Sequence, residues 1–311
     1  MRPFNAEELD QACVENTLLM PEYVCEQLVA AIDAGKHVIL TGPPGTGKTT
    51  LAYVAAELAR QSMMCTGYLP TTATSEWTTF ETIGGLQPTL DGLIFRAGLF
   101  VEAIETGRWL VIDELNRSNF DRAFGQLFTV LSGSAVVLPF KRKGQPQPIS
   151  IVPPGVEPPE KTDAIRVPAN WRIIATMNVF DKNLLFDMSY ALMRRFAFIE
   201  VGTPSEAVYQ KLLEGPGEIV AKLLPLRKFS DLGPAVYIDA AKYATRRAKD
   251  GPTQSRLLYE VFYAYFLPQF EGMEDRRATT LYRTVAQHLD PPEQAELQRT
   301  IGDVLGVELA V

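Results

Sequence analysis

A glycine-rich stretch, GPPGTGKT at residues 42–49, has residue types and spacing that suit the binding of a phosphate chain. It fits the pattern G-x-x-x-x-G-K-[ST] at Gly42, Gly47, Lys48 and Thr49. The glycines permit a turn in which several backbone N–H groups point at one phosphate chain, and the helix expected from Lys48 adds its positive end. Lys48 is expected to reach the β- and γ-phosphates of a nucleoside triphosphate, and Thr49 to ligate Mg²⁺. The residues predicted to contact the nucleotide are Gly42, Pro43, Pro44, Gly45, Thr46, Gly47, Lys48, Thr49 and Thr50.

Two acidic residues further along the chain suit the hydrolysis of a bound triphosphate. Asp113 and Glu114 end an apolar run that begins at Trp109 and predicts a buried strand. Downstream of a phosphate-binding loop, Asp113 is expected to hold Mg²⁺ through water, and Glu114 to polarise the attacking water as general base. Many strands end in acids without catalysing anything, but the loop upstream favours the catalytic interpretation.

Alternating strands and helices are expected to position these residues. An apolar run, His37–Leu40, predicts a strand before the loop, and the apolar residues after Lys48 share one helical face. Asp91-Gly92 favours a small β-hairpin that interrupts a helix. The other predicted strands are residues 63–69, 109–113, 171–176 and 196–201. The other predicted helices are residues 5–19, 21–34 and 98–105, one that opens at Ser118 and is closed by Gly133, and residues 205–214, 217–226, 234–249, 254–267, 275–289 and 292–305.

Residues 135–152 alternate in a way that is typical of a long hairpin, with Lys141, Arg142 and Lys143 at its tip. These cations are predicted either to attract nucleic acid or an acidic polypeptide, or only to keep an exposed hairpin edge soluble. The proline-rich residues that follow, as far as Pro159, are expected to form a loop. Gly202-Thr203-Pro204 is the best candidate boundary, which predicts a nucleotide-binding domain at 1–203 and an all-helical domain at 204–311.

Composition limits the class of protein. The chain has 311 residues, of which 46% are hydrophobic, and a net charge of −7. No apolar run approaches the roughly 20 residues that span a bilayer, and the first residues lack the apolar core of a signal peptide, so a cytoplasmic protein is expected. Three separated cysteines and two histidines predict neither a zinc site nor a disulfide framework. The negative charge argues against a nucleic-acid footprint over the whole surface.

Taken together, the motifs resemble the AAA+ superfamily, in the branch that contains McrB, MoxR and the dynein-related ATPases. The phosphate loop, the VIDEL run and the strand ending at Met177-Asn178 occur in the order of that superfamily. Three segments are more similar to McrB than to MoxR. They are IDELNRSNFDRAFGQLFTVL at 112–131, MNVFD at 177–181 and YALMRRFAFIE at 190–200.

The resemblance implies a three-layer α/β sandwich around a parallel sheet with a helical C-terminal lid, assembled as a ring that is expected to be hexameric. It also implies that Asn178 touches the γ-phosphate or the lytic water, and that Asp181 supports this loop. Arg194 and Arg195 would be fingers that reach the site of the next subunit, although a solvated strand entry is the alternative for this pair. A cation at that place has a physical reason, because the phosphate loop alone does not neutralise the transferring phosphoryl group.

The sequence also departs from related patterns and leaves the biological role open. The stretch at 232–240 lacks the arginine that begins many AAA+ lids. Separately, no guanine-reading Asn-Lys-x-Asp run is present, so ATP is the expected nucleotide and GTP is the alternative. The first hypothesis is a motor ATPase that drives a separately encoded effector, such as a McrC-like nuclease in restriction or phage defence. The second is a MoxR-like chaperone that remodels a protein client. The third is a nucleotide-binding switch or scaffold with little turnover.

Overall fold

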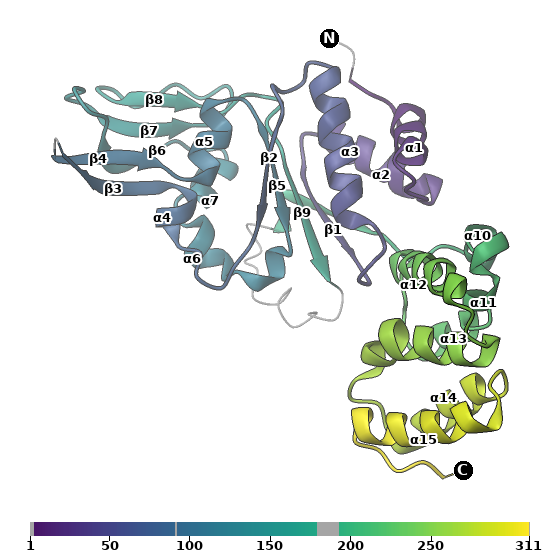
Figure 1. Ribbon diagram of the computed structural model, residues 1–311. Coiled ribbons are helices and arrows are strands. Elements are labelled where there is room, and N and C mark those ends of the chain that lie inside the picture. The colour runs from purple at the N-terminus through teal and green to yellow at the C-terminus, as the bar shows by residue number, and fades with distance from the viewer. Residues whose placement is uncertain (1–2, 91, 179–192, 311) are drawn as a thin grey trace. The chain divides into compact units, whose positions relative to one another are not determined.

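The computed structural model describes residues 3–90, 92–178 and 193–310, with the side chains of residues 120, 121 and 216 left aside. By contact density the chain divides into two compact units (Figure 1). The first comprises Met1–Gly42 and Lys48–Val201, and the second comprises Pro43–Gly47 and Gly202–Val311. Each unit is described by itself.

Five parallel strands form the central sheet of the first unit, in the order β10-β1-β9-β5-β2. All five of the predicted strands are present in it. The second begins later than predicted, because Met63 adopts positive φ and turns the chain before it becomes extended. The bounds are β1 His37–Gly42, β2 Tyr68–Thr72, β5 Trp109–Asp113, β9 Ile173–Asn178 and β10 Phe196–Glu200.

Helices cover both faces of this sheet, because successive strand residues point to opposite sides. Val38 and Leu40 pack with the helices before the sheet and with α3, whereas Ile39 packs with α5, α6 and α7 on the other side. The first unit is therefore a three-layer α/β sandwich, as the sequence predicted (Figure 1). The helices are α1 Ala6–Glu15, α2 Glu22–Asp33, α3 Lys48–Gln61, α4 Thr79–Thr82, α5 Leu99–Glu105, α6 Phe120–Phe124 and α7 Leu127–Leu131.

Two small sheets extend the first unit. Strands β3 Gly84–Thr89 and β4 Gly92–Ala97 pair as the predicted hairpin. Strands β6 Val136–Lys141 and β7 Pro148–Val152 form the second predicted hairpin, and β8 Asp163–Arg166 adds a parallel strand that was not predicted. Arg142 forms ion pairs with Glu105 and Asp163, so its charge is neutralised by its own chain. The hairpin tip is therefore less cationic than the sequence indicates.

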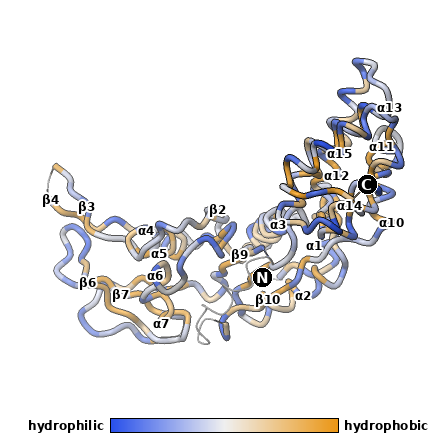
Figure 2. The backbone as a smooth tube through the Cα atoms, turned by 90° about the horizontal axis from the view of Figure 1, so that it is seen from below, coloured by the Kyte–Doolittle hydropathy of each residue, from blue (hydrophilic) through white to orange (hydrophobic). Residues whose placement is uncertain are grey.

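The second unit is helical around one apolar core, as predicted for the lid. Hydrophobic and hydrophilic residues alternate along its helices, as the coloured tube shows (Figure 2). The predicted helix 254–267 changes its hydrogen-bonding pattern midway, from α-helix to a π-helix at Phe262–Phe266. The α-helices are α10 Glu206–Leu212, α11 Glu218–Ala221, α12 Pro234–Arg247, α13 Gln254–Val261, α14 Asp275–Ala286 and α15 Pro291–Leu305.

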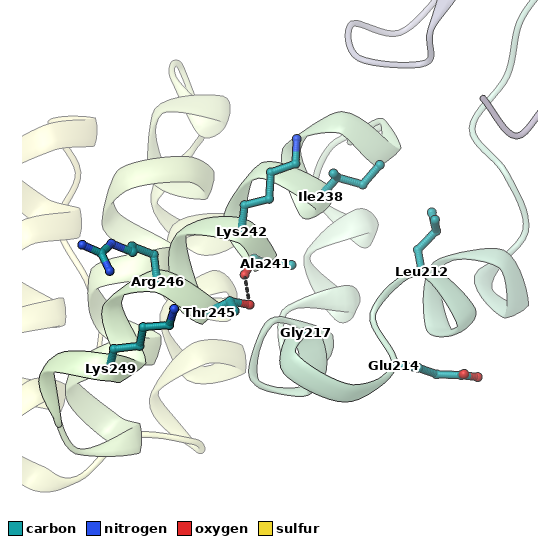
Figure 3. A pocket seen from close by; sticks show the side chains of 9 residues that line it. All are labelled: Leu212, Glu214, Gly217, Ile238, Ala241, Lys242, Thr245, Arg246 and Lys249. Carbon is teal, nitrogen blue, oxygen red and sulfur yellow. Dashed lines mark hydrogen bonds between the residues drawn. The ribbon is translucent and has the colours of Figure 1, made fainter. Parts of the chain in front are cut away.

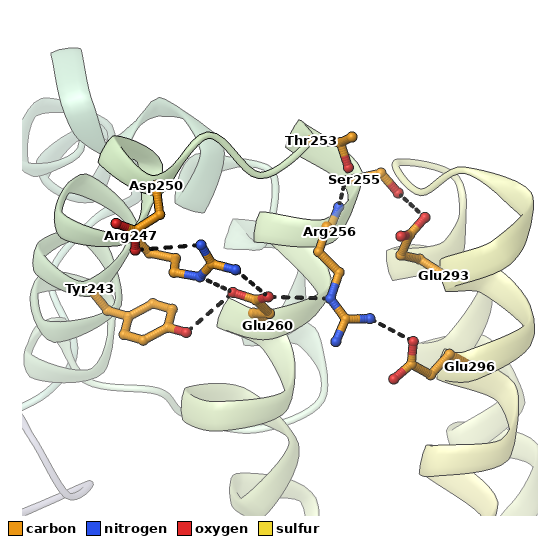
Figure 4. A network of polar contacts seen from close by, with 9 residues as sticks. All are labelled: Tyr243, Arg247, Asp250, Thr253, Ser255, Arg256, Glu260, Glu293 and Glu296. Atoms are coloured by element: carbon orange, nitrogen blue, oxygen red, sulfur yellow. Dashed lines mark hydrogen bonds and ion pairs between the residues drawn. The ribbon is translucent and has the colours of Figure 1, made fainter.

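A charged network joins three helices of the second unit (Figure 4). Glu260 on α13 accepts hydrogen bonds from Arg247 at 2.9 Å, from Arg256 at 3.2 Å and from the Tyr243 hydroxyl at 3.3 Å. Arg256 also donates to Glu296 on α15 at 2.6 Å. Burial alone would raise the pKa of Glu260, but the hydrogen bonds from Arg247 and Arg256 favour the carboxylate and lower it. Arg256 therefore links α13 to α15.

Among the helices of the described residues, none combines the length and the apolar character needed to cross a membrane.

Candidate active site

The phosphate loop connects β1 to α3, as predicted. Gly45 and Gly47 have φ of +74° and +85°, a region where a side chain would be strained, so the loop conformation requires glycine. The Thr46 hydroxyl donates to the Pro43 carbonyl at 3.0 Å and closes the turn. Within the second unit, the N–H of Ala235 at the start of α12 donates to the Gly45 carbonyl at 3.3 Å. The loop is thus a folded turn of the kind that phosphate binding needs.

Lys48 is buried, with 6% of its surface exposed. Its ammonium group donates to the carbonyl of Gly42 at 2.9 Å. Burial disfavours the charged form and lowers the pKa of Lys48 to about 8, although the carboxylates of Asp113 and Glu114 partly offset this effect. Near pH 8, Lys48 of the free protein is therefore only partly protonated, whereas a lysine side chain in water is almost fully protonated at this pH.

Nucleotide affinity should fall as the pH rises above about 8, because the triphosphate binds the ammonium form of Lys48. Bound phosphates raise the pKa of Lys48, so binding at pH 9 should take up a proton while binding at pH 7 should not. Isothermal titration calorimetry in two buffers of different ionisation enthalpy measures this uptake. Lys48→Arg is the control, since a guanidinium stays charged and its binding should show no uptake. Equal proton uptake by the two proteins would contradict the assignment.

A chain of hydrogen bonds connects the two acidic residues to the loop. The Thr49 hydroxyl on α3 donates to Asp113 Oδ1 at 2.6 Å. The Thr176 hydroxyl on β9 donates to the same oxygen at 2.6 Å and accepts from the N–H of Glu114 at 3.0 Å. The structure therefore brings the predicted Mg²⁺ ligands, Thr49 and Asp113, together. These hard oxygen donors fit Mg²⁺, which is commonly held by one or two protein oxygens together with phosphates and waters.

Thr176 is a site residue that the sequence interpretation missed. The sequence pattern predicts it only as the last residue of the strand 171–176. The signal that could have identified it is a hydroxyl in a strand that is otherwise buried and apolar, two positions before Asn178. Because β9 pairs with β5, with Ala175 opposite Ile112, the next residue of each strand, Thr176 and Asp113, comes together at the sheet edge.

Glu114 directly follows β5 and has left-handed backbone angles, φ 51° and ψ 48°. This conformation costs a non-glycine residue on the order of 1–2 kcal/mol, and such strain is characteristic of functional positions. The carboxylate forms an ion pair with Arg117, which lies on the one-turn helix η1 (Leu115–Arg117). The side chain of Glu114 is 27% exposed, so water can reach it. Arg117 was not predicted from the sequence.

Asn178 lies opposite Gly42 in the register of β9 and β1, so the predicted sensor residue is placed at the start of the phosphate loop. Asp181, predicted to support it, lies outside the described residues. Gly42, Asn178 and the acidic pair lie at the carboxyl-terminal edge of the sheet, where parallel sheets bind ligands.

The two predicted finger arginines differ in their surroundings. Arg195 is partly buried, and its guanidinium donates to the Ser132 carbonyl at 3.1 Å. The side chain of Arg194 is exposed, and its backbone carbonyl accepts from Lys36 at 2.9 Å. The Arg195 side chain thus contacts its own chain, whereas the Arg194 side chain is exposed in the turn just before the edge strand β10.

This fold and this site define a P-loop nucleoside triphosphatase with a central parallel sheet and a helical C-terminal region. Residues 37–196, more than half of the chain, match the model of the AAA domain, dynein-related subfamily. The chain belongs to this family and is an AAA+ ATPase of the McrB and dynein-related type.

Curated relatives agree with this assignment. The Type IV methyl-directed restriction enzyme EcoKMcrB subunit of Escherichia coli (strain K12) is 28% identical over 204 residues, which cover 61% of this chain and 41% of that protein. Uncharacterised proteins of Staphylococcus aureus strains bovine RF122 / ET3-1 and USA300 are each 27% identical over 172 residues, covering 55% of this chain and 57% of theirs. The chain spans less than two thirds of these relatives.

Proposed function

We propose that this protein hydrolyses ATP with Mg²⁺ as part of a homo-oligomeric ring and that this turnover drives a separately encoded effector. The observation that carries the proposal is the hydrogen-bonded series Thr49, Asp113, Thr176 and Glu114, which joins the phosphate loop to the residue expected to activate water. Hydrogen bonds that connect the phosphate loop to a strained acidic residue favour hydrolysis of the nucleotide over binding without hydrolysis.

Each residue then has one task in the reaction. The backbone N–H groups of the non-proline residues of the loop and the ammonium of Lys48 would hold the triphosphate, and Thr49 and Asp113 would hold Mg²⁺. When bound, the metal ion neutralises charge on the phosphates and orients them. Glu114 accepts a proton from the attacking water, while Asn178 orients that water against the γ-phosphate. The hydroxyl of Thr176 fixes the backbone of Glu114 relative to Asp113.

The ring proposal follows from the finger arginines. A cation is needed on the side of the γ-phosphate that the loop does not cover, and Arg194 is exposed and available to a neighbouring copy. We assign the finger to Arg194 and give Arg195 the role of positioning it, since Arg195 contacts Ser132 of its own chain. Repeating such a contact forms a ring if the rotations between successive copies add up to a full turn. Six copies are the expected number.

The effector proposal rests on the Escherichia coli relative, which is described as one subunit of a restriction enzyme. A McrC-like nuclease is the effector proposed here, with restriction or phage defence as the role. The cytoplasm is the proposed location. A MoxR-like chaperone for a protein client is the alternative. GTP is the alternative nucleotide, because the phosphate loop reads phosphates and not bases.

Phosphate release measured with ATP and with GTP tests the enzymatic part. We expect turnover that requires Mg²⁺, is faster with ATP and is lost in Lys48→Ala together with nucleotide binding. No turnover above that of Lys48→Ala would favour a switch or scaffold. The effector is tested by identifying what co-purifies with Glu114→Gln in ATP, where a nuclease supports the proposal and a client protein without nuclease activity supports the chaperone.

A further inference from the structure

The first two helices carry an unusual concentration of negative charge. Residues 3–35 contain seven aspartates and glutamates and no lysine, arginine or histidine. The charge of this segment, −7, is as large as the net charge of the whole chain. Six of these acids are exposed, and exposed apolar side chains lie among them, Val14 at 57% and Tyr23 at 48%. We call the exposed surface of α1 and α2 the acidic helix pair. Its buried side holds it on α3 and the sheet, through residues such as Leu9 and Leu28.

A groove with the opposite character runs along α12 in the second unit (Figure 3). Its volume is about 450 Å³. One side is formed by three exposed cations, Lys242, Arg246 and Lys249. Glu214, Thr245 and apolar side chains such as Leu212 and Ile238 complete the lining. We call this the basic groove.

The cations of the basic groove are available for a partner. Arg247, the neighbour of Arg246, turns inward to Glu260 and Asp250, so its charge is used within the unit (Figure 4). Arg246 instead lines the groove beside Thr245 and Lys249. Lys242 forms an ion pair with Asp239, but these side chains are 72% and 58% exposed, and an exposed pair of this kind is easily exchanged for another partner.

We propose that the acidic helix pair of one copy of this chain docks in the basic groove of the next copy. This inference rests on the ring of the proposed function and names a contact that holds it together. Charge complementarity selects the occupant: Glu22 and Glu26 are spaced i, i+4 on α2, as Lys242 and Arg246 are on α12, about 6 Å along each helix axis. Val14 and Tyr23 supply apolar surface for the wall formed by Leu212 and Ile238.

A nucleic acid fits this groove less well. Apolar side chains such as Leu212 and Ile238 line much of it, and a phosphate backbone has no apolar surface to cover them. An acidic, amphipathic protein surface satisfies the cations and the apolar wall together. The two surfaces differ, so docking in one direction is heterologous and, when repeated, produces a ring or a filament. Two copies that docked reciprocally would instead form a dimer, which sedimentation distinguishes by its size.

Charge reversal on each side tests the contact. One variant carries Glu15→Lys and Glu26→Lys, and the other carries Arg246→Glu and Lys249→Glu. These positions avoid the hydrogen-bonded cap between Asn5 and Glu8 and the pair between Lys242 and Asp239. Assembly is measured by sedimentation velocity with a slowly hydrolysed ATP analogue, at low and at high salt. A matched control, Lys228→Glu with Arg276→Glu, makes the same charge change elsewhere in the second unit.

Each variant alone should need a concentration at least about tenfold higher than the wild type for half-assembly, while the control should match the wild type. Wild-type assembly should also weaken with salt. Mixing the two variants should restore assembly, because every contact in an alternating ring then joins opposite charges. Melting curves that match the wild type show that each variant is folded.

Three outcomes would overturn the inference. If each variant alone assembles into rings like the wild type, this contact is excluded and the ring of the proposed function still stands. Loss of assembly without rescue in the mixture would indicate docking within one chain. Normal assembly of the Arg246→Glu and Lys249→Glu variant, with loss of binding to a labelled single-stranded oligonucleotide, would assign the groove to nucleic acid. A wild type that stays monomeric with nucleotide would overturn the ring proposal itself.

Discussion

Replacing Glu114 by Gln is expected to preserve nucleotide binding while reducing turnover by about 10²–10⁴-fold or more, the range for loss of a general base. Glutamine keeps the size of the side chain, but its amide cannot accept the proton of the attacking water. The residues that hold the nucleotide and the metal ion, Lys48, Thr49 and Asp113, remain in place. Single-turnover phosphate release measures the chemical step, and fluorescence titration with a labelled nucleotide measures affinity.

Two controls make this result specific to Glu114. Glu76→Gln removes an exposed carboxylate from the same unit and should leave both measurements unchanged. Lys48→Ala should lose affinity, which separates binding from chemistry. Near wild-type turnover in Glu114→Gln would show that another group activates the water, and the assignment of the general base would then be wrong.

The general architecture could be predicted because its signals are local. Val38, Ile39 and Leu40 form a continuous apolar run, and their alternation between two cores is a direct consequence of strand geometry. The phosphate loop is equally local, since its glycines, Lys48 and Thr49 stand within eight residues. The elements before and after the loop could therefore be placed with small errors at their ends.

Contacts between distant segments could not be predicted in the same way. Thr176 lies 63 residues from Asp113 in sequence, and only the pairing of β9 with β5 brings their side chains to 2.6 Å. The strand β8 depends on β7 as a partner and has only four residues, too few for a periodic signal. The sequence assigns Arg142 to a cationic tip, because its partners, Glu105 and Asp163, come from other elements.

The roles of the two finger arginines, Arg194 and Arg195, could not be distinguished from the sequence either. The sequence places Arg194 and Arg195 side by side and gives no reason to choose between them. Packing separates them, because Arg195 reaches the carbonyl of Ser132 after α7 while Arg194 remains exposed. The choice of Arg194 as the finger therefore depends on the structure, and it can be tested.

Arg194→Ala is expected to lower turnover by about 10³–10⁵-fold, the effect of losing an arginine that stabilises the transferring phosphoryl group, with nucleotide affinity retained. Arg195→Ala should chiefly lower the melting temperature, because it removes the hydrogen bond to Ser132, and its smaller loss of turnover should follow from a misplaced Arg194. Steady-state phosphate release and thermal unfolding distinguish these two effects. Arg122→Ala, an exposed arginine on α6, is the matched control.

Mixing Arg194→Ala with Glu114→Gln tests whether the finger acts on a neighbouring copy. In a randomly mixed ring of equal parts, about a quarter of the contacts join an intact Glu114 to an intact Arg194 of the adjacent chain, so up to about a quarter of wild-type turnover should return. Neither variant alone can produce such a contact. Subunit exchange, followed by energy transfer between labelled chains, shows that the rings have mixed. Mixed rings without recovered turnover would place Arg194 at the site of its own chain, because a residue that acts within one chain cannot be supplied by another.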